Sequence, residues 1–201
     1  CAWGRFTDDP TQARFVDQAV FRDFAPLDFL LNAADTGAMM HPAAWLVPRA
    51  VAERAGPWDE SLSLNDDGEY FCRAILAGSD VAFCTEAGAC SYYRSRLANS
   101  LSRQRSMRAR VSQFRSLELI EQHLRAVDNS PRAHHALANQ WQRFIYDFSP
   151  APADLMREAA RRVAALGGSS LQGPPMGPKT AALARIIGWK NVWRLKYHLH
   201  L

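Results

Sequence analysis

The order of apolar and polar residues divides the chain into two parts of different character. Up to about residue 100, short apolar runs alternate with turns containing Gly, Pro or Asp, which is typical of a mixed α/β fold. After residue 105, apolar residues recur at helical spacing over long stretches. The pattern therefore predicts an α/β part followed by an all-helical extension.

In the α/β part, strands are expected over residues 1–6, 18–21, 39–47, 80–84 and 89–94, and helices over 26–32, 48–55 and 68–77. Pro26 and Pro48 suit first helical turns, and Gly56 and Gly78 suit helix ends. These strands are too few to complete a sheet of this class, and the chain begins without Met, within an expected strand. We therefore expect further sequence on the N-terminal side.

The second part is expected to contain helices over residues 107–127, 131–148 and 152–166. A stretch rich in Gly, Pro and Ser follows, and then a basic amphipathic helix whose Trp189 and Trp193 share one face. That helix is expected either in a membrane interface or against another domain. The predicted domains are residues 1–105, 106–168 as a helical extension, 169–178 as a linker, and 179–201.

Composition narrows the class of protein. With 48% apolar residues in 201, the chain can bury a core, which excludes a disordered protein. A net charge of +4 fits an anionic substrate, a nucleic acid or a membrane surface without choosing among them. No apolar run approaches the ~20 residues that cross a bilayer. The four cysteines lack paired metal spacing and are expected to be reduced thiols of a cytosolic protein, with a Cys84–Cys90 disulfide as the alternative.

An acidic cluster stands out at the start of the third expected helix. Asp66, Asp67 and Glu69 place three carboxylates within four positions, directly before an apolar run. Acidic residues favour the positive end of a helix dipole, so a capping cluster is the simple interpretation. Three crowded anions also repel one another. Such repulsion raises the pKa of at least one carboxyl, which prepares a general base, or the cluster binds a cation.

The segments around this cluster occur in a familiar order: Ala44-Trp45-Leu46-Val47-Pro48-Arg49, Gly56-Pro57-Trp58-Asp59-Glu60, Asp66-Asp67-Gly68-Glu69 with Arg73, Gly78, and Tyr92-Tyr93-Arg94. This order resembles the C-terminal, acceptor-side half of a family 2 glycosyltransferase with the GT-A fold. The resemblance covers roughly residues 1–105. It implies an inverting enzyme that transfers a sugar from a nucleotide-sugar donor to a hydroxyl of a glycan or lipid-linked acceptor, as in the synthesis of cell-envelope polysaccharide.

The resemblance also implies roles for particular residues. Asp67 matches the family's catalytic base, and Asp66 and Glu69 would tune it or bind acceptor hydroxyls. The indoles of Trp58 and Trp45 offer faces on which a sugar can stack, with core packing as the alternative. Further expectations concern basic side chains: Arg94, Arg96 and Arg103 for a diphosphate, Arg73 for an ion pair within the helix packing, and His41 for a structural role.

The family's nucleotide-binding half, with its Asp-x-Asp metal motif, does not match this chain. A divalent metal, Mg or Mn, is therefore expected in the full-length enzyme, with ligands mostly outside these residues, and the isolated chain is expected to be inactive. Asp8 and Asp9 read as a polar turn rather than as that motif. The expected location is cytoplasmic and peripheral at the inner face of the membrane.

Two other functions compete with a transferase. One is a non-catalytic interaction domain, derived from a glycosyltransferase, that binds a partner through its C-terminal helices. The other is nucleic-acid binding through the Arg-rich residues 94–115. We expect no nucleic-acid partner, because no nucleic-acid motif accompanies these arginines and they suit the solvated face of a helix.

Overall fold

The computed structural model describes residues 1–86, 88–97, 100, 104, 106–149 and 153–198. The chain separates into two compact units, residues 1–133 and 134–201. The first unit combines a small sheet with helices, so the α/β class is confirmed for this part. The GT-A assignment stays a prediction.

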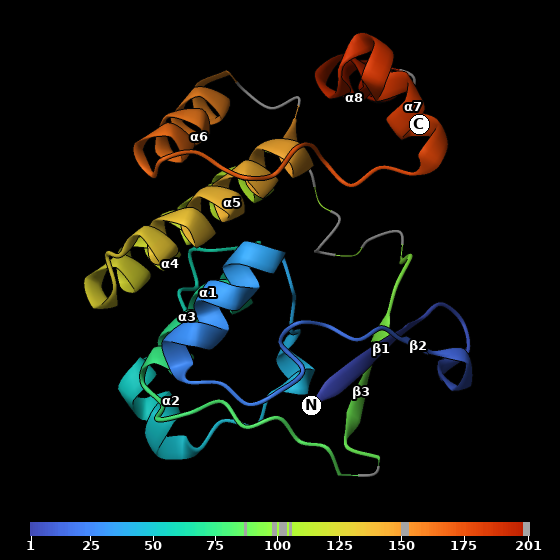
Figure 1. Cartoon of the computed structure of the whole chain (residues 1–201). Helices are drawn as coiled ribbons and strands as arrows, with labels where there is room; N and C mark the ends of the chain where they lie inside the picture. The colour runs from blue at the N-terminus through green and yellow to red at the C-terminus, as the bar shows by residue number, and fades with distance from the viewer. Residues whose placement is uncertain (87, 98–99, 101–103, 105, 150–152, 199–201) are drawn as a thin grey trace. The chain divides into compact units, whose positions relative to one another are not determined.

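The sheet of the first unit is built around β1, Ala2–Phe6 (Figure 1). On one side β1 pairs in parallel with β3, Cys90–Arg94, and on the other it pairs antiparallel with β2, Arg14–Phe15. The prediction of β1 and β3 is confirmed, whereas β2 was not expected. Between β1 and β2, Asp9 caps a short 3-10 helix, Pro10–Gln12, by accepting hydrogen bonds from the amide and hydroxyl of Thr11 at 2.9 and 2.7 Å.

Three predicted helices of the first unit are confirmed: α1, Pro26–Thr36; α2, Arg49–Ala55; and α3, Asp66–Leu76. Gly37 and Gly56 follow α1 and α2 with φ of 74° and 79°, a conformation that glycine adopts without strain. The apolar face of α3 packs into a core with α1 and the loops, made by Val20, Phe29, Ala55, Tyr70, Phe71, Ala74, Ile75 and Val81.

The strands predicted over residues 18–21, 39–47 and 80–84 are wrong. Residues 18–21 form a turn, closed by a hydrogen bond from the Phe21 amide to the Gln18 carbonyl. Within 39–47 the chain forms a 3-10 helix, Pro42–Ala44, because proline cannot donate to a strand ladder and suits the first position of a helical turn. Of residues 80–84, Val81 makes an isolated bridge with Phe24.

The next helix, α4, spans Met107–Val127 as predicted and packs on α3. Ser112 of α4 fixes the turn before α3. Its hydroxyl accepts the amides of Ser63 and Leu64 at 2.7 and 2.9 Å and lies 3.1 Å from the Leu64 carbonyl, to which it donates. Because of this packing, the first unit continues past residue 105, where the composition changes.

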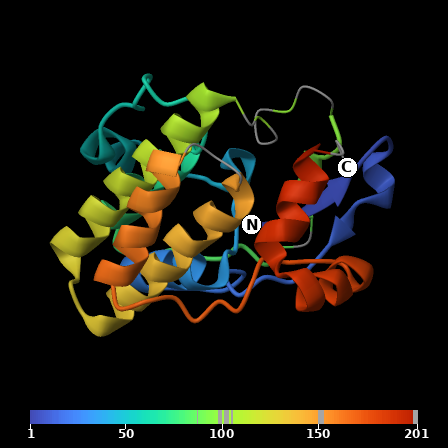
Figure 2. The ribbon, with the colours of Figure 1, turned by 90° about the horizontal axis from the view of Figure 1, so that it is seen from above.

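The boundary between the units falls within α5, Pro131–Phe148. In the second unit, α6, Ala153–Ala165, lies beside α5 (Figure 2), and the Arg162 guanidinium is 5.0 Å from the Trp141 ring. The buried Asn139 of α5 accepts hydrogen bonds from the Ser169 hydroxyl at 2.6 Å and the Ser170 amide at 3.1 Å. The start of the predicted linker is therefore fastened to α5.

The final predicted helix is broken in two. Gly188, with φ 79° and ψ 145°, separates α7, Pro178–Ile187, from α8, Trp189–His198. Among the helices of the described residues, none combines the length and apolarity that crossing a bilayer requires. All four cysteines carry free thiols, as expected for reduced residues.

We expect Ser112→Ala to lower the free energy of unfolding by about 1–3 kcal/mol, because it leaves the half-buried amides of Ser63 and Leu64 without their acceptor. Urea denaturation followed by circular dichroism measures this. The matched control is Val111→Ala, at an exposed position one residue earlier on α4, with a change within about 0.5 kcal/mol. Equal effects of the two variants would contradict the assigned role of Ser112.

Candidate active site

The acidic cluster forms the first turn of α3, directly after Asn65. The backbone and side chain of Asn65 fix where this turn begins. Asn65 has a left-handed backbone, φ 60° and ψ 25°, a conformation that Asn tolerates better than most residues. Its side-chain amide donates to the Ser116 hydroxyl on α4, so it makes no cap for α3. A Cβ at Gly68 would overlap the Asn65 side chain, lying 2.8 Å from its Cγ. Glycine at 68 is therefore needed to accommodate Asn65.

Two carboxyls in the first turns of α3 have pKa values shifted in opposite directions. Burial raises the pKa of Asp67, and the neighbouring charge of Asp66 raises it further, against the lowering effect of a 2.9 Å hydrogen bond from the Gly68 amide. Burial also acts to raise the pKa of Glu69, but its hydrogen bonds and ion pairs with Arg73 and His123 outweigh that effect, and its pKa is lowered.

The buried Glu69 and the partly buried Arg73 form a clamp that joins α3 to its neighbours. The Arg73 guanidinium donates to Glu69 through Nε at 2.7 Å and Nη2 at 2.9 Å. It also donates to the Ala55 carbonyl at the end of α2 and, at 2.9 Å, to the Pro57 carbonyl. His123 of α4 lies 3.2 Å from the same carboxylate. The expected pairing of Arg73 inside the helix packing is confirmed.

This arrangement bears on Glu69 as a candidate for acceptor binding. Its side chain is only 3% exposed and both of its oxygens bond to Arg73. The carboxylate therefore orients Arg73, which holds the turn after α2, and its role in acceptor binding stays a prediction. His123 was missed by sequence reasoning because it is 54 residues from Glu69 and no local pattern links them.

Trp58 lies in the turn that Arg73 fastens. Its indole stacks on the Tyr70 ring, with centroids 4.4 Å apart and planes 8° apart, and meets Phe71 edge-on. It is 39% exposed, so part of the ring system stays open to a ligand. Tyr70 follows Asp66 and Asp67 by one helical turn, which places Trp58 near the acidic end of α3.

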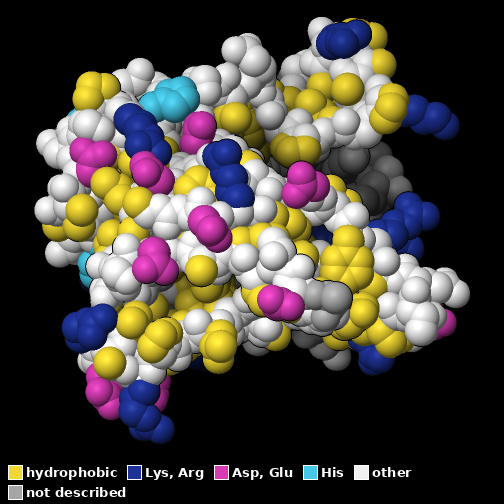
Figure 3. All heavy atoms as spheres, turned by 60° about the horizontal axis from the view of Figure 1, so that its bottom comes forward, with side chains coloured by type: hydrophobic (Ala, Val, Ile, Leu, Met, Phe, Trp, Pro, Cys, Tyr) yellow, Lys and Arg dark blue, Asp and Glu magenta, His cyan; other side chains and the backbone are white. Residues whose placement is uncertain are grey.

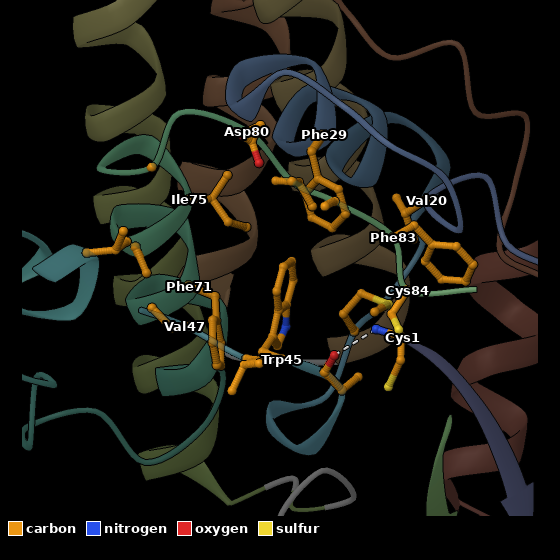
Figure 4. Close-up of a pocket in the computed structure, with 18 of the residues that line it drawn as sticks. Cys1, Val20, Phe29, Trp45, Val47, Phe71, Ile75, Asp80, Phe83 and Cys84 are labelled. Carbon is orange, nitrogen blue, oxygen red and sulfur yellow. Dashed lines mark hydrogen bonds between the residues drawn. The ribbon is translucent and has the colours of Figure 1, made fainter. Parts of the chain in front are cut away.

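Trp45 lies in different surroundings, in an apolar pocket of about 580 Å³ (Figure 4). Its indole stacks on Phe71 at 5.2 Å and meets Phe29 edge-on at 5.3 Å. Its buried Nε1 has no hydrogen-bond partner, and the nitrogen-bearing edge faces the side of Cys1 and Cys84 in Figure 4. None of the acidic cluster lines this pocket, nor does Trp58. The two tryptophans predicted for one substrate thus occupy different environments.

The arginines predicted to bind a diphosphate, Arg94 and Arg96, lie at and just after the end of β3. Arg94 ends β3 with its guanidinium 5.4 Å from the Phe6 ring, and Arg96 is exposed, with φ 63°. Within the described residues, neither is bonded to the acidic cluster. Arg103 lies outside the described residues.

His41 is buried against the edge of Trp3 and within 3.0 Å of the Ser91 hydroxyl, while burial and the N-terminal charge lower its pKa. Both features favour the expected structural role of a neutral imidazole.

The described side chains do not form a metal site by themselves, and the expected ligands outside these residues stay a prediction. In the described parts of the chain, no group of three or more His, Cys, Asp and Glu side chains converges as metal ligands would. Asp9, for its part, caps the turn before β2.

Comparison with known proteins adds no assignment. No protein-family model matches the chain, and neither does any curated protein or solved structure.

We expect Asp67→Asn to stabilise the chain at pH 7, with the gain disappearing by about pH 3. The folded-state pKa of Asp67 is raised, so the ionised carboxylate opposes folding above that pKa, whereas below the unfolded-state value both states are protonated. Chemical denaturation at several pH values measures the effect.

Glu69→Gln is the control of opposite sign. The lowered pKa of Glu69 means that its charge stabilises the fold above its ordinary value, so this variant loses stability at pH 7. An Asp67→Asn variant that is less stable than the parent at pH 7 would show that the carboxylate is a structural cap.

Proposed function

We propose that this chain carries the catalytic base and acceptor side of an inverting glycosyltransferase that uses a nucleotide-sugar donor. The acceptor is a hydroxyl of a glycan or of a lipid-linked sugar. The observation that carries the proposal is the placement of Asp67, which lies partly buried beside Asp66 in the first turn of α3, one helical turn from Tyr70 and the half-exposed Trp58 stacked on it. The raised pKa of Asp67 agrees with a role as a base.

Asp67 is the proposed base. Inverting transfer requires a group that accepts the proton of the acceptor hydroxyl as its oxygen attacks the anomeric carbon and the nucleoside diphosphate departs. A carboxyl with a raised pKa is a stronger base than a solvated one. Asp66 supports this role twice, because its charge raises the pKa of Asp67 and its own oxygens can accept hydrogen bonds from acceptor hydroxyls.

Trp58 is the proposed platform for the acceptor ring, through the part of its indole that Tyr70 leaves uncovered. Glu69 and Arg73 are positioning residues, because they fix the turn that carries Trp58. Arg94 and Arg96 are proposed for the departing diphosphate, whose charge a guanidinium matches.

The proposed reaction also uses a nucleotide and a divalent metal. Groups other than the described residues would hold both of them. A cytoplasmic location next to a membrane also belongs to it.

In the transferase that contains this chain, we expect Asp67→Asn to lower kcat by about 10²–10⁴-fold, because the amide cannot accept the proton. Asp66→Asn is the matched control and should lose far less. Transfer from radiolabelled nucleotide sugars to a panel of glycan acceptors measures both rates, and donor titration checks that binding is kept. A larger loss in Asp66→Asn would move the base by one residue. Normal turnover in both variants, or glycan binding without any transfer, would favour the non-catalytic interaction domain.

A further inference from the structure

The C-terminal segment has an unusual charge pattern. Glu158 is the last acidic residue of the chain, and the residues after it include seven Lys and Arg. Three of these side chains are exposed. Lys179 lies at the start of α7, Arg185 near its end, and Lys190 at the start of α8. No acidic side chain in this segment offsets their positive charge.

Apolar side chains are exposed among these basic ones. Ile186 is 81% exposed and Leu183 is 42% exposed, one turn apart on the same face of α7. Lys179 lies one and two turns before them on that face. Leu195 of α8 is also exposed. Figure 3 shows yellow and blue side chains gathered together where α7 and α8 lie.

The inner side of the same segment is packed. Val192 of α8 is buried, and the Trp189 ring meets the Tyr146 ring of α5 edge-on, with centroids 5.0 Å apart. Trp189 therefore packs partly inside its own unit. The sequence pattern alone had suggested that this ring lies on the exposed face of the helix. The outer face consists instead of Leu183 and Ile186 with their basic neighbours.

We propose that the outer face of α7, with the start of α8, binds the surface of an anionic lipid bilayer. Aliphatic side chains flanked by Lys and Arg suit the headgroup boundary, where the apolar groups enter the acyl region and the cations meet lipid phosphates and carboxylates. A nucleic acid would match the charge but not an exposed Ile and Leu. A protein partner would require a complementary acidic and apolar surface. The proposal does not depend on the transferase activity.

The test is co-sedimentation of the full chain with vesicles of phosphatidylcholine, with and without about 30 mol% phosphatidylserine. We expect binding only to the anionic vesicles and a decline between about 0.1 M and 0.5 M salt, because salt screens the attraction. Replacing Lys179, Arg185 and Lys190 together by Gln should weaken binding about 100-fold, roughly fivefold for each charge.

The matched control replaces the exposed Arg14, Arg49 and Arg108 by Gln, which lowers the net charge equally at other places. This control should keep nearly all of the binding. A second variant, Leu183→Ser with Ile186→Ser, should also weaken binding while circular dichroism remains that of the parent, because both side chains are exposed.

Three outcomes would overturn the proposal. They are absence of binding to anionic vesicles, equal losses in the two triple-Gln variants, and unchanged binding after both apolar replacements. Binding of DNA or a soluble protein that depends on the same residues, without vesicle binding, would assign the face to that partner.

Discussion

The ion pair between the buried Glu69 and the partly buried Arg73 is the interaction on which the first unit depends. One guanidinium bonds to α3, to the last carbonyl of α2 and to the turn after it, and the carboxylate also meets His123 of α4. Removing one partner of a fully buried pair typically costs about 3–5 kcal/mol. Because the Arg73 side chain is 19% exposed, we expect its removal to cost less than that. The turn that carries Trp58 therefore cannot move independently of α3, so the candidate site and the stability of the unit rest on the same contacts.

The acidic cluster cannot be explained by capping alone. A helix N-terminus lowers the pKa of nearby carboxyls, and a cap would use an acidic side chain to accept the free amides of the first turn. Here the residue before α3 is Asn65, whose side chain bonds to α4 instead of capping, while Asp67 accepts one free first-turn amide, that of Gly68, at 2.9 Å. At Asp67, burial and the charge of Asp66 outweigh the hydrogen bonds from backbone amides, and the pKa of this carboxyl is raised. Tolerating such a cost is common at functional sites and uncommon in a purely structural helix.

Sequence patterns predicted the helices well, because helical periodicity, Pro at first turns and Gly at ends are local signals; α4 and α5 have the expected bounds. Short apolar runs were wrongly predicted as strands, because a strand needs a hydrogen-bonded neighbour that local sequence does not specify. In one of these runs, Pro42 begins a helical turn instead. The site follows the same division. The Arg73–Glu69 pair, four residues apart, was predictable. The contact of His123 with Glu69 arises from tertiary packing, as do the different surroundings of Trp45 and Trp58 on either side of the shared Phe71 ring.

The proposed membrane surface and the proposed base make different physical demands on the chain. A base acts only when held within hydrogen-bond reach of its proton, which the clamp around α3 supports in the first unit. Attraction between basic side chains and an anionic bilayer extends over about 10 Å and needs no fixed geometry. A basic surface in the second unit can therefore bind a bilayer without a fixed orientation toward α3. If the acceptor is lipid-linked, holding the chain at the bilayer raises the local concentration of that acceptor, which increases encounters without any new contact at Asp67.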